Sequence, residues 1–208
     1  MKGLIGKKLG MTSVYLEDGT YVPCTILEVP DNYVVQIRTK ERDGYEAIQL
    51  GTYDKKPQRV NKPLLKHFEK AGVSPKYYLK EFEFDNVEEL NVGDVLKVEE
   101  LFSEGEFVNV RAKTKGKGFQ GVVKRHNFAG VGGRTHGQHN RERAPGSLGG
   151  ASYPARVFKG KKLPGRMGNK MVMIRNLEVV KIYPERKLML VKGSVPGPRG
   201  RVVYIYGN

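Results

Sequence analysis

Short segments of alternating apolar and polar residues, rich in β-branched and aromatic side chains, recur along most of this chain. The first two, residues 14–16 and 21–22, flank Asp18-Gly19, and an Asp-Gly step is a strong signal for a tight turn. We therefore expect a hairpin over residues 11–29. Further strands are predicted at residues 33–39, 45–50, 77–84, 94–98, 107–110, 171–183, 188–192 and 201–206, with 171–183 and 188–192 antiparallel and 193–200 a loop.

One segment has the periodicity of a helix instead. In residues 62–71, apolar side chains recur at helical spacing, at Leu64, Leu65, Phe68 and Ala71. Asn61 can cap its start, Pro63 suits a first turn and Gly72 can end it. We interpret this segment as a helix that packs on the strands. One clear helix among many short strands is typical of a closed, mostly antiparallel barrel, so the predicted fold class is mostly β.

The positive charge of the chain is concentrated in one segment. Residues 111–170 hold fifteen Lys or Arg residues and one acid, Glu142, a net charge of +14, whereas the whole chain carries +15. The same segment holds 13 of the 26 glycines. Because it cannot bury enough apolar surface to offset its ordering entropy, a partner must order it, and a polyanion is the best candidate. We therefore predict a globular β-barrel domain of residues 1–110 and 171–208, from which residues 111–170 emerge as a basic, Gly-rich extension.

The side chains of this extension suit a long tract of nucleic-acid backbone. Lysine and arginine neutralise phosphates, and arginine adds bidentate contacts and stacking on bases. The aromatic residues among the charges are expected either to stack on bases or to return to the core; they are Phe119, Phe128, Tyr153 and Phe158. A short helix is predicted around residues 119–125, which would place Lys124 and Arg125 together. Beyond residue 128 we expect irregular chain, as for a segment threaded through folded RNA.

Residues 81–106 have the opposite charge, with ten acids against one base, Lys97. Glu81, Glu83 and Asp85 would share one face of a strand. We interpret this segment as a solvated or protein-facing surface that faces away from any RNA. A metal site on that face is the alternative interpretation.

Composition narrows the location of the protein. The apolar runs are too short to span a membrane, and the first residues have too short an apolar centre for a signal peptide. Cys24, the single cysteine, excludes an internal disulfide and a Cys-based zinc site. We therefore expect a cytosolic protein. Binding to a membrane surface would need an amphipathic apolar face, which the basic segment lacks.

Residues 116–121 spell GxGxxG, which suggests as an alternative the nucleotide-binding loop of an RNA-modifying or nucleotide-dependent enzyme. A dinucleotide site needs a following helix and an acid about 20 residues further on, within a βαβ unit. Glu142 alone is near that place, and no parallel alternation of strands and helices surrounds it. A kinase loop needs a catalytic Asp and an Asp-Phe-Gly motif, which the sequence lacks. We therefore expect no enzyme activity, no catalytic residue, no cofactor and no small-molecule substrate.

Three histidines, His126, His136 and His139, also lie in the basic extension. Three imidazoles can bind zinc, but the surrounding positive charge disfavours a dication, and no cysteine or acid cluster joins them. We expect no metal here. The expected roles are stacking on bases and hydrogen bonding to phosphate.

Several motifs give the chain a specific resemblance to a known family. Phe102, Asn109, Ala112-Lys113-Thr114, Gly116-Lys117-Gly118, Gly121 and Arg125 match the signature of the large-subunit ribosomal protein L3 family. Residues 3–12 look like the N-terminus of that family, and residues 144–149, 157–162 and 167–169 look like the rest of its extension. The resemblance covers essentially the whole chain, whose length fits the bacterial form.

The resemblance implies a closed six-stranded Greek-key barrel of the translation-protein type. It implies a cytoplasmic, ribosome-bound protein that binds large-subunit (23S) rRNA early in subunit assembly, with ribosomal proteins L14 and L19 as neighbours. It also implies that the extended loop approaches the peptidyl transferase centre, where RNA does the chemistry. Some members have a methylated glutamine near the loop tip. Gly150-Ala151-Ser152 occupies that region here, so we do not expect this modification.

The residues that we expect to bind RNA combine the N-terminal lysines with the basic, histidine and aromatic positions of the extension. They are Lys2, Lys7, Lys8, Lys113, Lys115, Lys117, Phe119, Lys124, Arg125, His126, Arg134, His136, His139, Arg141, Arg143, Arg156, Lys159, Lys161, Lys162, Arg166 and Lys170. The neutral tip expected near the peptidyl transferase centre comprises Gly146, Ser147, Gly149, Gly150, Ser152 and Tyr153. Small residues allow a close approach to RNA.

Overall fold

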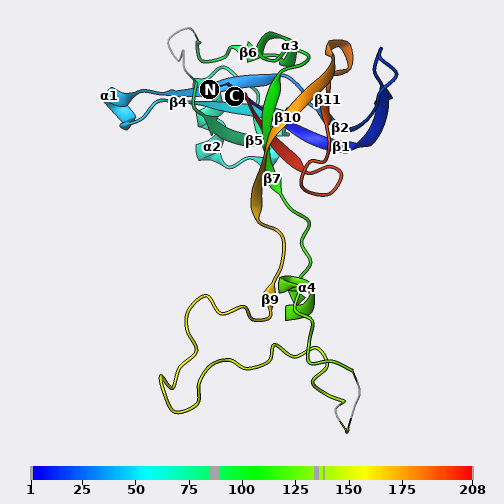
Figure 1. The fold of residues 1–208 in the computed structure, drawn as a ribbon. Helices are drawn as coiled ribbons and strands as arrows, with labels where there is room; N and C mark the ends of the chain where they lie inside the picture. The colour runs from blue at the N-terminus through cyan, green and yellow to red at the C-terminus, as the bar shows by residue number, and fades with distance from the viewer. Residues whose placement is uncertain (1, 85–89, 134–135, 138, 208) are drawn as a thin grey trace. The chain divides into compact units, whose positions relative to one another are not determined.

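The chain divides into two compact units. The computed structural model describes residues 2–84, 90–133, 136–137 and 139–207. The first unit, here called the barrel unit, comprises Met1–Thr114 and Met171–Asn208, and the second, the extension unit, comprises Lys115–Lys170. Residues 111–113 belong to the barrel unit because the strand that holds them continues to Lys113. Each unit is described by itself (Figure 1).

Six antiparallel strands close the barrel, in the order β1-β12-β7-β10-β11-β2. They are β1 (Gly3–Tyr15), β2 (Tyr21–Glu28), β7 (Phe107–Lys113), β10 (Met171–Tyr183), β11 (Leu188–Lys192) and β12 (Val202–Gly207). The closed, six-stranded, mostly β fold expected from the sequence is confirmed. Both ends of the described chain lie in this barrel, where Gly3 pairs with Tyr206 (Figure 1).

The predicted hairpins have the expected register. Tyr15 pairs with Tyr21 across the first turn, and Tyr183 pairs with Leu188 across the second, where a 3-10 turn, η3 (Pro184–Arg186), joins β10 to β11. The start of β1 was not predicted, because residues 3–10 are rich in glycine and lysine. A Cβ atom at Gly6 would lie 2.5 Å from the Glu28 carbonyl oxygen, so only glycine fits this crossing of strands.

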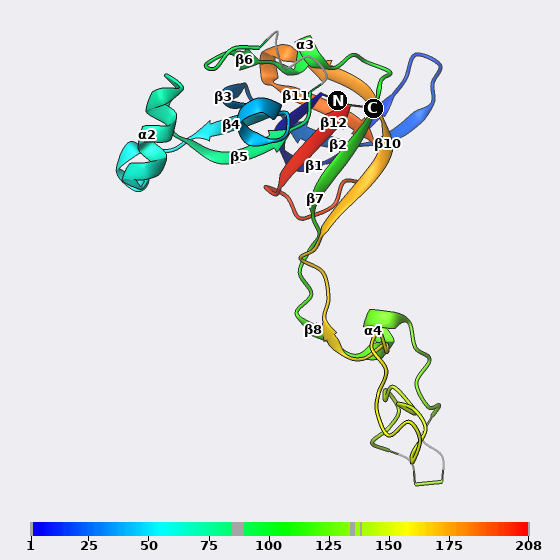
Figure 2. The same cartoon turned by 90° about the vertical axis from the view of Figure 1, so that its left-hand side faces the viewer.

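Alternating side chains of the six strands fill the barrel. In β7 and β12, every second residue is buried, and these strands lie side by side with β10 (Figure 2). The buried interior includes Leu4, Ile5, Leu27, Val108, Val110, Val179, Met189, Val191, Val203 and Ile205. Burying each such side chain contributes roughly 1.5–3 kcal/mol, so this core holds the barrel unit together.

A four-stranded sheet in the order β5-β4-β3-β6 packs beside the barrel within the same unit. Its elements are β3 (Asn32–Arg38), α1 (Lys40–Asp43), β4 (Ala47–Asp54), η1 (Pro57–Arg59), α2 (Lys62–Lys70), β5 (Lys76–Phe82), β6 (Val95–Leu96) and α3 (Val98–Leu101). The strand predicted over residues 94–98 was wrong at its end. Lys97 is the N-cap of α3, and its backbone N–H donates to the Glu100 carboxylate at 3.2 Å, which starts a helix there.

The predicted helix is confirmed as α2. Phe68 is fully buried and packs with Val35, Ala71 and Val73, while Leu64 borders this cluster. The helix begins after Asn61, although the Asn61 side chain forms no capping hydrogen bond. Gly72 follows the helix with a φ of 65°, the left-handed conformation that favours glycine.

Candidate nucleic-acid interface

The two ends of the extension unit run antiparallel and are joined by backbone hydrogen bonds. The two-residue strands β8 (Phe119–Gln120) and β9 (Gly165–Arg166) pair with each other. Beside them, the Lys117 N–H donates to the Met167 carbonyl at 3.0 Å, and the Met167 N–H donates to the Gly118 carbonyl at 2.9 Å. This short ladder gives the segment a defined base.

A single-turn helix, α4 (Val122–His126), sits on this base. The Arg125 guanidinium donates to the Leu163 carbonyl at 2.6 Å, and the Nε2 atom of His126 lies 3.1 Å from the same oxygen. Val122 is 1% exposed. The helix predicted around residues 119–125 is therefore confirmed with a later start, because Phe119 and Gln120 pair with β9. Arg125 and His126 are half-buried, whereas Lys124 is exposed.

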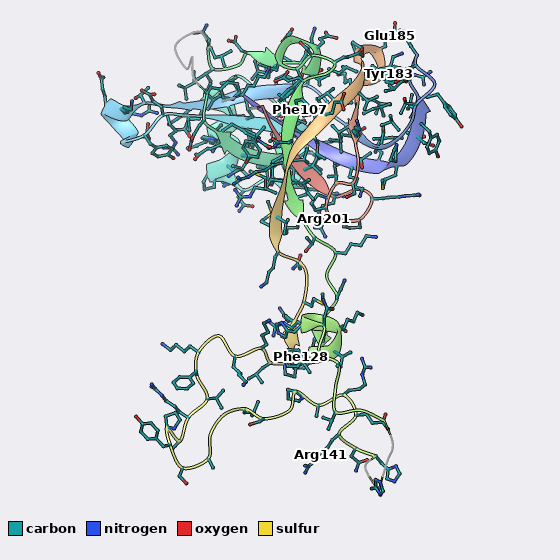
Figure 3. All side chains as sticks on the ribbon, viewed as in Figure 1. Phe107, Phe128, Arg141, Tyr183, Glu185 and Arg201 are labelled. Atoms are coloured by element: carbon teal, nitrogen blue, oxygen red, sulfur yellow. The ribbon has the colours of Figure 1, made fainter. Side chains whose placement is uncertain are left out.

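From residue 128 to residue 164, the described chain is irregular, as predicted. A few local contacts shape it: the Val131 N–H donates to the Glu142 carbonyl at 3.2 Å, and the Arg156 guanidinium lies 5.2 Å from the centre of the Phe158 ring. Figure 3 shows Arg141 on this irregular path and Phe128 near its start. Phe128 is half-buried with its ring 6.1 Å from that of His126.

Most of the predicted RNA-binding residues present their side chains to solvent. The exposed ones are Lys113, Lys115, Lys117, Phe119, Lys124, His136, His139, Arg141, Arg143, Arg156, Lys159, Lys161, Lys162, Arg166 and Lys170. The six predicted tip residues, Gly146, Ser147, Gly149, Gly150, Ser152 and Tyr153, are exposed as well. Arg134 lies outside the described residues. Glu142 is the one acid that the sequence places in this unit, so almost all of its charged side chains are positive.

Exposed rings accompany this charge. Phe119 is 73% exposed, Phe158 58% and Tyr153 91%. Folding alone does not explain aromatic side chains left so open to water, since their apolar area is stabilised by burial. Rings flanked by cationic side chains suit stacking on bases together with neutralisation of phosphates.

The three N-terminal lysines are engaged within the barrel unit. Lys8 is 9% exposed, and its ammonium donates to the Val195 carbonyl at 2.6 Å. The Lys7 ammonium lies 3.4 Å from the centre of the Tyr53 ring, and Lys2 forms a 2.9 Å ion pair with Glu106. Each lysine thus has a structural role, and contact of these three with RNA stays a prediction.

A cationic groove on the barrel unit was not predicted from the sequence. It has a volume of about 440 Å³ and is lined by Lys113, Arg199 and Arg201, with the rings of Tyr78 and Tyr204. Burial raises the pKa of Tyr204, so this phenol stays neutral and can donate a hydrogen bond. In the sequence, this groove is indicated by Arg199-Gly200-Arg201, which lies in a segment predicted to be a connecting loop. Figure 3 labels Arg201 at the start of β12.

The structure gives no support to a nucleotide-binding loop at residues 116–121. Gly121 precedes a helix, but α4 has five residues, and β8 pairs antiparallel with β9 instead of lying in a βαβ unit. Among the described residues, no group of three or more His, Cys, Asp or Glu side chains is placed to hold a metal ion. Within the same residues, no helix is long and apolar enough to cross a membrane.

The acidic segment is partly neutralised by the barrel unit. Glu81 lies 3.6 Å from the Arg38 guanidinium, and Glu106 pairs with Lys2. Glu81 belongs to β5, whereas Glu83 follows the end of that strand, and Asp85 lies outside the described residues. Glu81 and Glu83 therefore do not share the face of one strand, because β5 ends at Phe82.

Comparison with known families agrees with this picture of a cationic extension on a closed barrel. A family model described as Ribosomal protein L3 matches residues 78–187, more than half of the chain. The match spans the whole extension unit and parts of the barrel on both sides of it.

Proposed function

Because this chain belongs to the ribosomal protein L3 family, we propose that its extension unit binds large-subunit rRNA along its length and carries its tip toward the peptidyl transferase centre. The family consists of structural proteins of the large ribosomal subunit that bind rRNA, and it is not an enzyme family. The protein acts by binding, and RNA performs the chemistry.

The observation that carries this proposal is the sorting of charge between the two units. Between Lys115 and Lys170, the sequence holds thirteen Lys or Arg residues against Glu142. Most of their side chains are exposed on an irregular segment with a narrow hydrogen-bonded base. Mutual repulsion disfavours this arrangement in isolation, and phosphates remove that repulsion.

The tip differs from its flanks in a way that suits close contact with packed nucleotides. Between Arg143 and Arg156, the sequence is uncharged and rich in small residues. The basic flanks would hold the loop on phosphates, while the tip meets bases and sugars without a bulky side chain in the way.

The same reasoning extends to assembly and neighbours. A segment that needs rRNA to order it binds before the surrounding RNA has closed, so we assign the protein to early subunit assembly. The acidic segment 81–106 then faces away from RNA, where ribosomal proteins L14 and L19 are the proposed neighbours.

Co-sedimentation tests this function. We expect the tagged protein in cell lysate to travel with large subunits, and to appear already in their early precursors. A variant with Lys159, Lys161, Lys162 and Arg166 changed to Gln should be depleted from both fractions. A matched variant with Lys40, Lys97, Lys181 and Arg186 changed to Gln should be retained. Parent protein that sediments apart from ribosomes would refute the proposal.

A further inference from the structure

The barrel unit is close to neutral in sum, but its charges are not mixed. The residues outside 111–170 sum to +1, and Arg111 and Lys113, which also belong to this unit, raise its sum to +3. Residues 81–106 carry a large excess of acid, whereas residues 55–70 hold six Lys or Arg residues and one acid, Glu69, a net charge of +5. The near-neutral sum thus hides a second basic segment, which includes η1 and α2.

Three of these cations form a row along one face of α2. Lys62, Lys66 and Lys70 are spaced four residues apart, so they recur about every 6 Å along the helix axis. All three are exposed, as are Lys56 and Arg59 just before the helix. We call Lys62, Lys66 and Lys70 the lysine row.

The lysine row opposes the stability of the helix that carries it. Like charges four residues apart destabilise a helix by roughly 0.2–0.5 kcal/mol a pair. Lys62 also stands at the positive end of the helix dipole, where the first turn holds no acid and Asn61 makes no side-chain cap, whereas Lys70 in the last turn has the favourable sign. Within the part of the chain that the structure describes, no acid pairs with Lys62, Lys66 or Lys70. The like charges in this row are unfavourable for the helix, and no contact among the described residues compensates for them. Such an arrangement indicates that a ligand binds here.

The opposite face of α2 shows which class of polyanion fits. A basic amphipathic helix binds a lipid surface through its apolar side. Here that side is occupied, because Phe68 and Leu64 pack on the sheet beside Val35 and Leu79. What remains exposed is mainly lysine, which is depleted at protein–protein interfaces and common at phosphate contacts.

We propose that the lysine row, with Lys56 and Arg59, is a second rRNA-binding surface, separate in the fold from the extension unit. It would follow the phosphate backbone of one RNA segment and carry no base specificity. This inference takes large-subunit rRNA as the ligand from the proposed function. It concerns residues and an element that do not belong to the extension unit.

The test uses the full-length protein and purified large-subunit rRNA. We compare the parent with Lys62→Gln/Lys66→Gln/Lys70→Gln and with a control, Lys40→Gln/Lys181→Gln/Arg186→Gln, which removes three exposed cations elsewhere on the barrel unit. A third variant, Lys161→Gln/Lys162→Gln, reports on the extension. The readouts are the salt dependence of binding, hydroxyl-radical footprints on the RNA, thermal unfolding without RNA and co-sedimentation of each tagged variant with large subunits in cell lysate.

We expect the lysine-row variant to lose about two units of the log–log salt slope, at roughly 0.7–0.9 per phosphate. One footprint should disappear, different from the footprint lost in the extension variant. Thermal unfolding of the lysine-row variant should be unchanged or slightly raised, since the repulsion within α2 is relieved. The control should retain the slope and both footprints.

Three outcomes separate the alternatives. If the parent binds no rRNA, the proposed function fails and this inference fails with it. If the extension variant loses a footprint while the lysine-row variant binds like the control, the second surface does not exist. If the lysine-row variant binds free rRNA like the parent but is missing from large subunits, the row contacts a protein and the assignment to RNA is overturned.

Discussion

The Arg125 guanidinium donates a hydrogen bond to the Leu163 carbonyl at 2.6 Å, which joins two points of the extension unit that lie 38 residues apart in sequence. The same guanidinium lies against Gly165, where a Cβ atom would come 2.6 Å from Nη1. An arginine expected to contact phosphate thus also closes the base of its own unit.

Loss of Arg125 should loosen that base. A hydrogen bond from a charged group contributes about 1.5–3 kcal/mol. In Arg125→Ala we expect the amides of Lys117 and Met167, both hydrogen-bonded in this base, to exchange with solvent at least about tenfold faster. Lys124→Ala, next to it and exposed, is the control and should leave both rates unchanged. Equal rates in all three proteins would show that Arg125 does not hold the base together.

Lys161 and Lys162 should each contact phosphate, because both are exposed and lie on the segment with the densest charge. Replacing both by Ala should lower the log–log salt slope of rRNA binding by about one to two units. A Lys40→Ala/Lys181→Ala protein should keep the parent slope. The prediction is contradicted if the two double variants give the same slope.

The barrel unit should fold without the extension. Ala112 and Val172 are paired in the β7–β10 ladder, so a short Gly-Ser link from Ala112 to Asn169 can close the gap as a hairpin. We expect this variant to unfold in one cooperative transition, followed by circular dichroism in urea. In the intact free protein, trypsin should cut first between Lys113 and Lys170. Early cuts spread evenly over the chain would argue against separate units.

Bulky residues at the tip should disturb the peptidyl transferase centre without blocking assembly. A Cβ atom at Gly149 would come no closer than 3.8 Å to the chain itself, but the φ of 157° favours glycine, so Gly149→Arg has room for its side chain and strains the backbone locally at the irregular tip. Ser152 is exposed and is not in a left-handed conformation, so Ser152→Leu adds its bulk on the solvent side without that strain. We expect both variants to enter ribosomes, and the purified subunits to differ from the parent in peptide-bond formation or in inhibition by drugs at that centre. Full incorporation with both measurements unchanged would mean that the tip lies elsewhere.

Asp54 should stabilise the barrel unit in a pH-dependent way. It accepts a 2.7 Å hydrogen bond from Lys76, whose side chain is 2% exposed, and this contact lowers the pKa of Asp54. Because the folded-state pKa lies below the unfolded value near 3.8, the contribution is full above that pH and is lost as pH falls through the folded value.

In Asp54→Asn the buried Lys76 ammonium loses its counter-charge. Because the Asp54 side chain is 76% exposed and solvent screens the pair, we expect the free energy of unfolding at pH 7 to fall by less than about 1 kcal/mol, and the loss of stability below about pH 3.8 to become shallower. Urea unfolding across that pH range measures both. Glu185→Gln, an exposed acid on η3, should leave the curve unchanged.

Local features of the sequence determined most of the strand and helix predictions. The Asp18-Gly19 turn, the helical spacing up to Phe68 and the strands 171–183 and 188–192 depend on residues close together in the chain, and all were confirmed. The surplus of charge and glycine in residues 111–170 was also visible, because it needs no tertiary information to be recognised.

Tertiary structure decided what depends on contacts between distant segments. The first strand begins at Gly3 because barrel closure pairs it with β12, and no local pattern of glycine and lysine signals this. Closure of the barrel also brings Arg199 and Arg201 beside Lys113 and buries Lys8. Composition and periodicity record which residues are present and in what order. Which cations meet solvent and which meet a carbonyl is decided only when strands far apart in sequence are packed together.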